Sequence, residues 1–126
     1  MALTHVTTIR NQLADVTVDA IDAGTTDTTG DLEIMTSGDV EVATLTWTAT
    51  PAFGAASGGT ATMNAINDDT NATGGTAALF KFQDRDNAEV FRGTVATSGA
   101  DLNLSSVAIG ATDTVSITSF TYSASA

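Results

Sequence analysis

The spacing of apolar residues changes once along this chain, and that change limits the fold more than any other feature. Near the N-terminus, Val6, Ile9, Leu13, Val16 and Ala20 follow one another at steps of three and four residues. Steps of this size place the apolar side chains on one face of a helix. The pattern predicts an N-terminal amphipathic helix.

Beyond this helix or arm, which we assign to residues 1–24, the pattern becomes β-like. The polar stretch GTTDTTGD at residues 24–31 predicts a turn-rich linker. From Asp31 onward apolar and polar residues alternate, and most of the chain's 24 threonines lie in this part. Threonine is β-branched and suits a half-exposed strand. We expect a β-sandwich body over residues 31–126, with a single domain overall.

The predicted helix has weak intrinsic support. Thr4 is a suitable N-cap and Gly24 a suitable residue after the C-terminus. However, Asp15, Asp19 and Asp22 crowd its C-terminal half, where the helix dipole disfavours negative charge. Such a helix depends on tertiary packing. We therefore expect the helix to lie against the body or against a neighbouring subunit.

The strands are predicted from short alternating stretches with Gly, Asn and Asp between them. The clearest hairpin joins residues 77–83 to residues 89–96 through the turn-forming sequence DRDNAE. Together the stretches favour a mainly β fold, an antiparallel β-sandwich or jelly roll with a short N-terminal α-helix. The expected strands cover residues 32–35, 40–48, 59–66, 77–83, 89–96, 101–106, 107–109 and 114–123.

Several of these strands change phase along their length. A shift of one residue turns the apolar set to the other face, and a bulge or a bend between two sheets restores it to the core. We interpret the shifts as long strands bent between two sheets. The phase changes between Val42 and Leu45, between Leu104 and Val107, and between Ile117 and Phe120.

Composition sets limits on the core and on the partners. Of the 126 residues 42% are hydrophobic, but only 6% are aromatic, which predicts a thin core supported by a partner or by oligomerisation. Four basic residues against fifteen acidic ones give a net charge of -11. This charge disfavours binding to nucleic acids and to anionic membranes, and it suits either a solvated surface or a basic partner.

The sequence offers little for catalysis or metal binding. His5 is the only histidine, cysteine is absent, and no nucleophile elbow or phosphate-binding loop occurs, so we predict a non-enzymatic protein without a cofactor. Two acidic loops, NDDTN at residues 67–71 and DRDN at residues 84–87, are weak calcium candidates, and ordinary Asx turns are the favoured interpretation of both. The four candidate ligands are Asp68, Asp69, Asp84 and Asp86.

The few aromatic and basic residues have two possible uses. Trp47, Tyr122 and Phe53 suit a sugar-binding platform in a glycan-binding or adhesin-like module, although burial preference places Trp47 in the core. Lys81 and Arg92 lie on the two strands of the clearest hairpin, either opposite each other or paired with acids. Arg92 is a candidate for fixing the register of an interface.

The sequence PAFGAASGGTATMNAI at residues 51–66 contains almost only small side chains after Phe53. We expect Pro51–Gly59 to be a connection anchored by Phe53, followed by a slim strand. Small residues such as Ala55 and Ala56 let another backbone approach closely, which predicts a contact with a subunit or another partner; a surface loop beside a weak edge strand is the alternative. The candidate interface residues are Val6, Ile9, Leu13, Phe53, Ala55, Ala56 and Arg92.

Four stretches of the chain resemble small virion proteins of tailed bacteriophages: MALTHVTTIRNQLADVTVDAIDAGT, PAFGAASGGTATMNAI, GGTAALFKFQDRDNAEVFRGTV and DTVSITSFTYSASA. In character the chain is most similar to capsid decoration, or cement, proteins. This resemblance implies a β-rich trimer that binds the major capsid protein on the outer capsid, within a virion assembled in the host bacterial cytoplasm. A tail or neck component is the alternative location.

Overall fold

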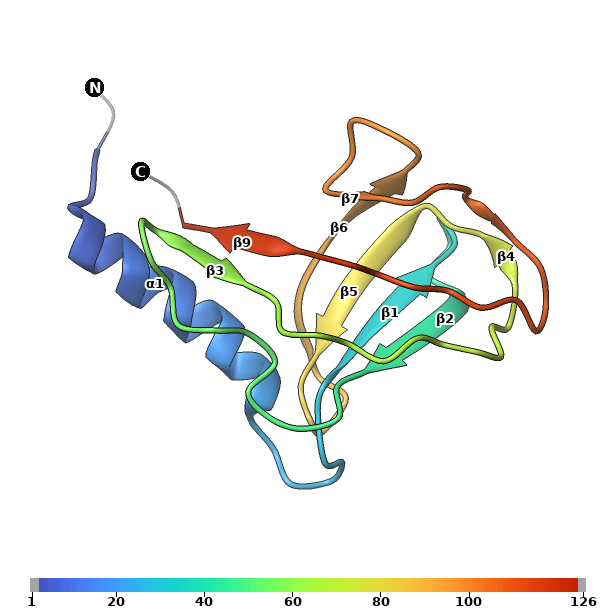
Figure 1. The fold of residues 1–126 in the computed structure, drawn as a ribbon, viewed down its shortest axis with the longest axis horizontal. Helices are drawn as coiled ribbons and strands as arrows, with labels where there is room; N and C mark the ends of the chain where they lie inside the picture. Colours follow the sequence, from blue (N-terminus) through green and yellow to red (C-terminus); the bar gives the residue numbers. More distant parts are fainter. Residues whose placement is uncertain (1–2, 125–126) are drawn as a thin grey trace.

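A computed structural model describes residues 3–124 of the chain. The fold is mainly β, with one helix at the N-terminal end (Figure 1). Helix α1 covers Thr7–Asp19, and a short 3-10 helix η1 covers Ala20–Asp22. The strands are β1 (Asp31–Met35), β2 (Glu41–Thr46), β3 (Thr60–Thr62), β4 (Gly75–Thr76), β5 (Leu79–Gln83), β6 (Glu89–Ala96), β7 (Leu102–Asn103), β8 (Ala108–Ile109) and β9 (Thr121–Ser123).

The helix begins later than predicted and ends as predicted. Val6, not Thr4, precedes its first residue, and Val6 makes no side-chain capping bond. Gly24 follows the C-terminal end with φ +110°, a conformation that glycine adopts without steric cost. The helical arm and the linker therefore meet at the expected residue.

Five strands form the main sheet in the order β2-β1-β5-β6-β7. The first four strands pair antiparallel, whereas β7 pairs parallel with β6, so the sheet is mixed. The predicted hairpin is confirmed as β5 and β6, with Lys81 directly opposite Arg92. The prediction of a purely antiparallel sheet is wrong at β7, because residues 97–101 bring the chain back alongside β6 in the same direction.

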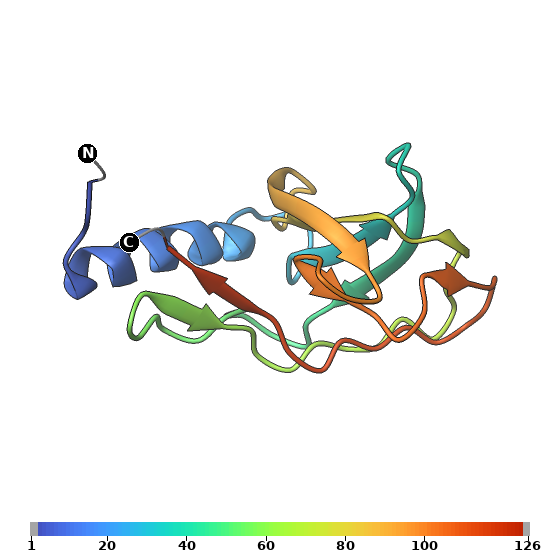
Figure 2. The same cartoon turned by 90° about the horizontal axis from the view of Figure 1, so that it is seen from above.

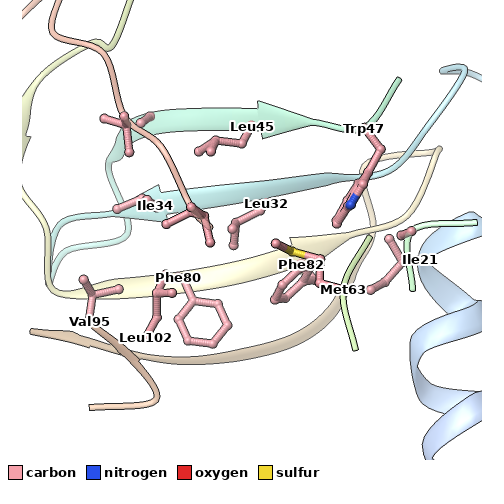
Figure 3. Close-up of a cluster of buried hydrophobic side chains, with 14 of the residues drawn as sticks. Ile21, Leu32, Ile34, Leu45, Trp47, Met63, Phe80, Phe82, Val95 and Leu102 are labelled. Atoms are coloured by element: carbon pink, nitrogen blue, oxygen red, sulfur yellow. The ribbon is translucent and has the colours of Figure 1, made fainter. Parts of the chain in front are cut away.

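One face of this sheet is apolar and the other is polar. Leu32 and Ile34 of β1 alternate with Glu33, and Phe80 and Phe82 of β5 alternate with Lys81. The apolar side chains point into one cluster, which Ile21 of η1 joins at one end (Figure 3). This period-two alternation is typical of a sheet with one covered and one solvated face.

A second layer covers the apolar face, but it is not a regular sheet. In Figures 1 and 2 the segment leading into β9 crosses the main sheet, and β9 then pairs with β3 beside α1. Val115 and Ile117 of this segment are buried although they lie outside named strands. The structure shows a second layer built from short pairs and irregular backbone, where we expected the second sheet of a sandwich.

The phase shifts have two different causes. In β2, Ala43 pairs with Ile34 and Glu41 pairs with Met35, so Val42 is an extra residue. This bulge lets Val42 and Leu45 both reach the core, as the sequence predicts. The prediction of long bent strands is wrong for the other two shifts: β7 and β8 are separate short strands, and only residues 121–123 of the last stretch are regular.

The core contains few aromatic residues, but they lie together. The chain has one tryptophan, one tyrosine and five phenylalanines, and each of them lies next to at least one other in a single connected cluster. Phe82 lies at its centre, with ring centroids 4.8 Å from Phe91 and 5.1 Å from Phe120. Aromatic pairs at these distances add to the stabilisation given by burial alone.

Candidate functional site

Three polar side chains on one face of α1 and η1 hold the helix against the loop of residues 51–59. Each accepts a hydrogen bond from a main-chain N–H of that loop. The pairs are Asn11 Oδ1 with Gly59 (2.7 Å), Asp15 Oδ1 with Ala56 (2.7 Å) and Asp22 Oδ1 with Ala52 (3.0 Å). These side-chain acceptors satisfy three main-chain N–H groups of the loop that would otherwise be costly to bury.

The small residues of the loop permit this close contact. A Cβ on Gly59 would lie 2.7 Å from the Arg10 guanidinium carbon, and Gly59 also has φ +81°. Beneath the polar contacts Ala14, Val18 and Ile21 are buried against the body. Gly59 is therefore the position of the loop where the contact with the helix leaves least room for a side chain.

The acidic residues also explain why a helix with an unfavourable charge distribution forms. Asp15 and Asp22 crowd the C-terminal half of the helix, yet both carboxylates face loop amides. Burial raises the pKa of Asp22, against the opposing effect of the hydrogen bond from Ala52. The sequence shows these acids, but the amides that they bind lie 30 and 41 residues further along the chain.

The apolar face of the helix points away from the body. Leu3, Val6 and Val16 are 82%, 70% and 73% exposed, and Ile9 and Leu13 are about two-fifths exposed. The helix lies against the body, which is one of the two expected arrangements, but it makes this contact with its polar face and not with the exposed apolar residues. We call this exposed set the helix stripe: Ile9, Leu13 and Val16 lie on α1, and Leu3 and Val6 lie just before it.

The candidate interface residues of the loop divide into two kinds. Phe53 is buried, 2% exposed, and packs against Trp47 and Phe82, so its side chain is not available to a partner. Ala55 is exposed, whereas Ala56 is half-buried and holds the Asp15 bond through its amide. Within this loop, Ala55 is the proposed contact residue with an exposed side chain.

Arg92 lies on the solvated face of the main sheet and is already engaged. Its guanidinium contacts Glu89 Oε1 at 2.7 Å and Asp39 Oδ1 at 3.1 Å. These contacts raise the pKa of Arg92 and lower that of Glu89, the hydrogen bond between them being the largest cause for each. Across from it, Lys81 pairs with Glu33 at 3.8 Å. Arg92, predicted as an interface residue, therefore belongs to a group of ion pairs on the surface of its own chain.

The calcium candidates bind their own chain. Among residues 3–124, no three His, Cys, Asp or Glu side chains come together as a metal site. Asp68 is exposed. The other three carboxylates accept main-chain bonds: Asp69 from Thr44 and Asn71, Asp84 from Asp86 and Ala88, and Asp86 from Thr25 and Thr26. The geometry favours the Asx-turn interpretation.

The aromatic platform for sugars is absent at the predicted place. Trp47 is 3% exposed and donates its indole N–H to the carbonyl of Asn64 at 3.3 Å. Tyr122 is half-buried against Phe91.

A polar groove of about 620 Å³ lies between residues 101–109 and 113–121. The Asp101 carboxylate, which lines this groove, accepts a hydrogen bond from the main-chain N–H of Thr94 in β6.

One titratable group stands apart from these contacts. Asp31, at the start of β1, has an Oδ1 that is buried without a hydrogen-bond partner among the described residues. Burial, together with the nearby Glu33 and Asp27 carboxylates and against a lowering by Lys81, raises the pKa of Asp31 to about 6. Ionised Asp31 therefore costs stability at neutral pH.

Comparisons with protein-family models, with curated proteins and with solved structures give no match for this chain. Within the described residues, the helices are too short and too polar to cross a bilayer. Evidence about function therefore comes from the residues and the geometry.

Proposed function

We propose that this chain is a non-enzymatic structural protein of a tailed-phage virion, a capsid decoration protein that binds the major capsid protein on the outer surface. The resemblance of four stretches to small virion proteins supports this role. The observation that carries it is the helix stripe, which leaves a row of large apolar side chains exposed on a firmly attached helix. Such a row is typical of a surface that is covered in an assembly.

The distribution of charge also supports an assembly role. The chain carries a net charge of -11, with the four cations outnumbered by fifteen acids. A surface of one sign accelerates association with a surface of the other sign and keeps unbound copies apart. A basic region of the capsid shell suits this chain as a partner.

The fold is compatible with a reduced form of the architecture that we expect for such proteins. The main sheet and the layer that contains β3, β9 and residues 113–120 enclose one apolar core between them (Figure 2). We propose that this arrangement is a jelly-roll-like sandwich in which the second sheet is reduced to short pairs.

Co-sedimentation with DNA-free capsids of the phage that encodes the chain tests the role. We expect the protein to pellet with capsids and to saturate. Ala55→Glu should weaken binding, because it adds bulk and charge to the exposed part of the loop. Ser98→Glu, at an exposed position in the turn between β6 and β7, is the control. Wild-type protein that stays in the supernatant at saturating capsid would refute the proposal.

Immunogold labelling of intact virions tests the location independently. Label on the heads supports decoration of the capsid. Label confined to the tail or the neck refutes it and supports the alternative virion component.

A further inference from the structure

The two edges of the main sheet end differently. At the β2 edge a neighbouring loop closes the strand, because Asn67 and Gly74 donate main-chain hydrogen bonds to the carbonyls of Thr46 and Val42. At the other edge β7 is the last strand, and within residues 3–124 no further strand pairs with it. The free side of β7 borders the polar groove of about 620 Å³. An unpaired edge of this kind offers main-chain donors and acceptors to another strand.

The opposite wall of the groove is a strand-like segment without a strand partner. After β8 the chain turns back and crosses the main sheet toward β9 (Figure 1). Burial alternates along this segment, with Val115 and Ile117 buried and Ser116 and Thr118 exposed, as in an extended strand. Among the described residues, however, the main chain of residues 116–119 makes no hydrogen bond to another main-chain group. The segment therefore has the alternation of a strand but lacks its pairing.

The direction of the main-chain groups on this segment follows from its one contact. The N–H and the C=O of Val115 both pair with Asp69, which lies in the loop beside β2. Main-chain groups of successive residues in a strand point to opposite edges. The groups of Ser116 and Thr118 are therefore directed to the other side, toward β7 and the groove.

Strand β7 offers matching groups from its own side. The Leu104 N–H donates to the carbonyl of Ala96 in β6 at 2.9 Å. By the same alternation, the main-chain groups of Asn103 point away from β6 and toward the groove. Both walls thus present main-chain donors and acceptors, which is the arrangement that an inserted polypeptide strand requires.

The side chains that line the groove indicate the chemistry of the occupant. Leu102 and Ile117 contribute buried apolar side chains. The charged residues of the lining are Asp101 and Asp113, both acidic, in a chain of net charge -11. Side chains of an inserted strand alternate between the core side and solvent, so apolar residues should alternate with basic ones that complement these acids.

We propose that this groove binds an extended segment of a partner polypeptide in which apolar residues alternate with lysine or arginine. The segment pairs through its main chain with Asn103 on one side and with Ser116 and Thr118 on the other, and it extends the main sheet beyond β7. In recognition of this type the main-chain hydrogen bonds provide affinity and the alternate side chains provide specificity. This inference does not depend on the virion role.

Calorimetric titration with a synthetic octapeptide of alternating valine and lysine, with blocked ends, tests the site. We expect saturable binding of one peptide per chain. The same peptide with proline at its two central valines keeps the charge but loses two N–H groups, so it should bind about tenfold more weakly. A peptide of alternating valine and glutamate should not bind, because like charges meet. No binding of the lysine peptide up to about 1 mM, or equal binding of either control peptide, refutes the proposal.

A matched pair of proline variants tests the position of the site. Ser116→Pro removes an N–H that points into the groove and should weaken binding about three- to tenfold, with an unchanged circular dichroism spectrum because Ser116 is exposed. Ser37→Pro is the control: Ser37 is exposed in the turn closed by the bond from Asp39 to Thr36, where proline fits. It should bind as the wild type does, and equal affinities of the two variants refute the site.

Hydrogen exchange of the wild-type protein gives a reading that needs no variant. The lysine peptide should increase the protection of the Asn103, Ser116 and Thr118 amides. Protection that increases only elsewhere refutes the proposal. Protection of these amides by maltohexaose but not by the peptide assigns the groove to glycans instead. Protection that rises with protein concentration in the absence of peptide assigns it to a second copy, and either result overturns the proposal.

Discussion

Replacing Asp15 with alanine is expected to loosen α1 from the loop and to lower the free energy of unfolding by about 2 kcal/mol. Asp15 Oδ1 accepts the Ala56 N–H at 2.7 Å in a half-buried position. A hydrogen bond to a charged acceptor contributes roughly 1.5–3 kcal/mol, and alanine also leaves the Ala56 amide without this partner. Partial solvent access places the expected loss in the middle of that range.

Urea unfolding at one fixed protein concentration measures this loss. For a domain of this size the free energy falls by roughly 1–3 kcal/mol per molar urea, so the midpoint should decrease by about 1 M. The concentration is held constant because any self-association adds to the apparent stability. Hydrogen exchange of the Ala56 amide supplies a local reading, and its protection should fall more than that of amides in β1 and β5.

Two matched variants separate the hydrogen bond from the charge. Asp15→Asn keeps an acceptor oxygen and should lose about half as much free energy, since neutral acceptors are weaker. Asp19→Ala removes an exposed acid from the same helix and should be neutral or stabilising by a few tenths of a kcal/mol, because negative charge near a helix C-terminus is unfavourable. Equal effects of Asp15→Ala and Asp19→Ala would refute the proposed attachment of the helix.

Two further predictions concern the body. The pKa of Asp31 is raised from 3.8 to about 6, so its ionisation destabilises the fold progressively as the pH rises from 4 to 6. Asp31→Asn should therefore raise the free energy of unfolding by about 1 kcal/mol at pH 7, after allowance for partial exposure, and should not change it below pH 4. Urea unfolding across this pH range measures both values. Gly30→Ala should lower the melting temperature strongly and the free energy of unfolding by about 3 kcal/mol, because the new Cβ would lie 2.4 Å from the Gln83 carbonyl oxygen and 2.6 Å from Ile21 Cγ2. Gly38→Ala is the control and should change the melting temperature little, since the nearest atom to its Cβ would be 3.9 Å away. A pH-independent Asp31→Asn effect, or equal effects of the two glycine variants, would contradict these assignments.

The sequence predicted those elements that depend on residues close together in the chain. The three- and four-residue steps predicted the helix, and alternation with turn formers predicted the β5–β6 hairpin. The phase change after Val42 indicated either a bulge or a bend, and the pairing of β1 with β2 contains a bulge. These features depend on residues close in sequence, so a single chain displays them.

Long-range contacts decided what the sequence did not show. The orientation of the helix depends on amides of Ala56 and Gly59, which lie 41 and 48 residues beyond Asp15 and Asn11. The sequence predicted that the helix lies against the body or a neighbouring subunit, but the spacing of apolar residues does not reveal which face of the helix makes the contact. Likewise Phe53 appeared free for a partner, although the thin core uses every aromatic ring.

The contacts between helix and loop have a consequence for how this surface can vary through evolution. Asn11, Asp15 and Asp22 bind the main chain of the loop, so they specify its path without specifying its side chains. Ala55 and Ser57 are exposed between these anchor points. Substitutions there can change the chemistry offered to a binding partner while the helix remains attached. Substitutions in the loop can thus change which partner it binds while the attachment of the helix is kept.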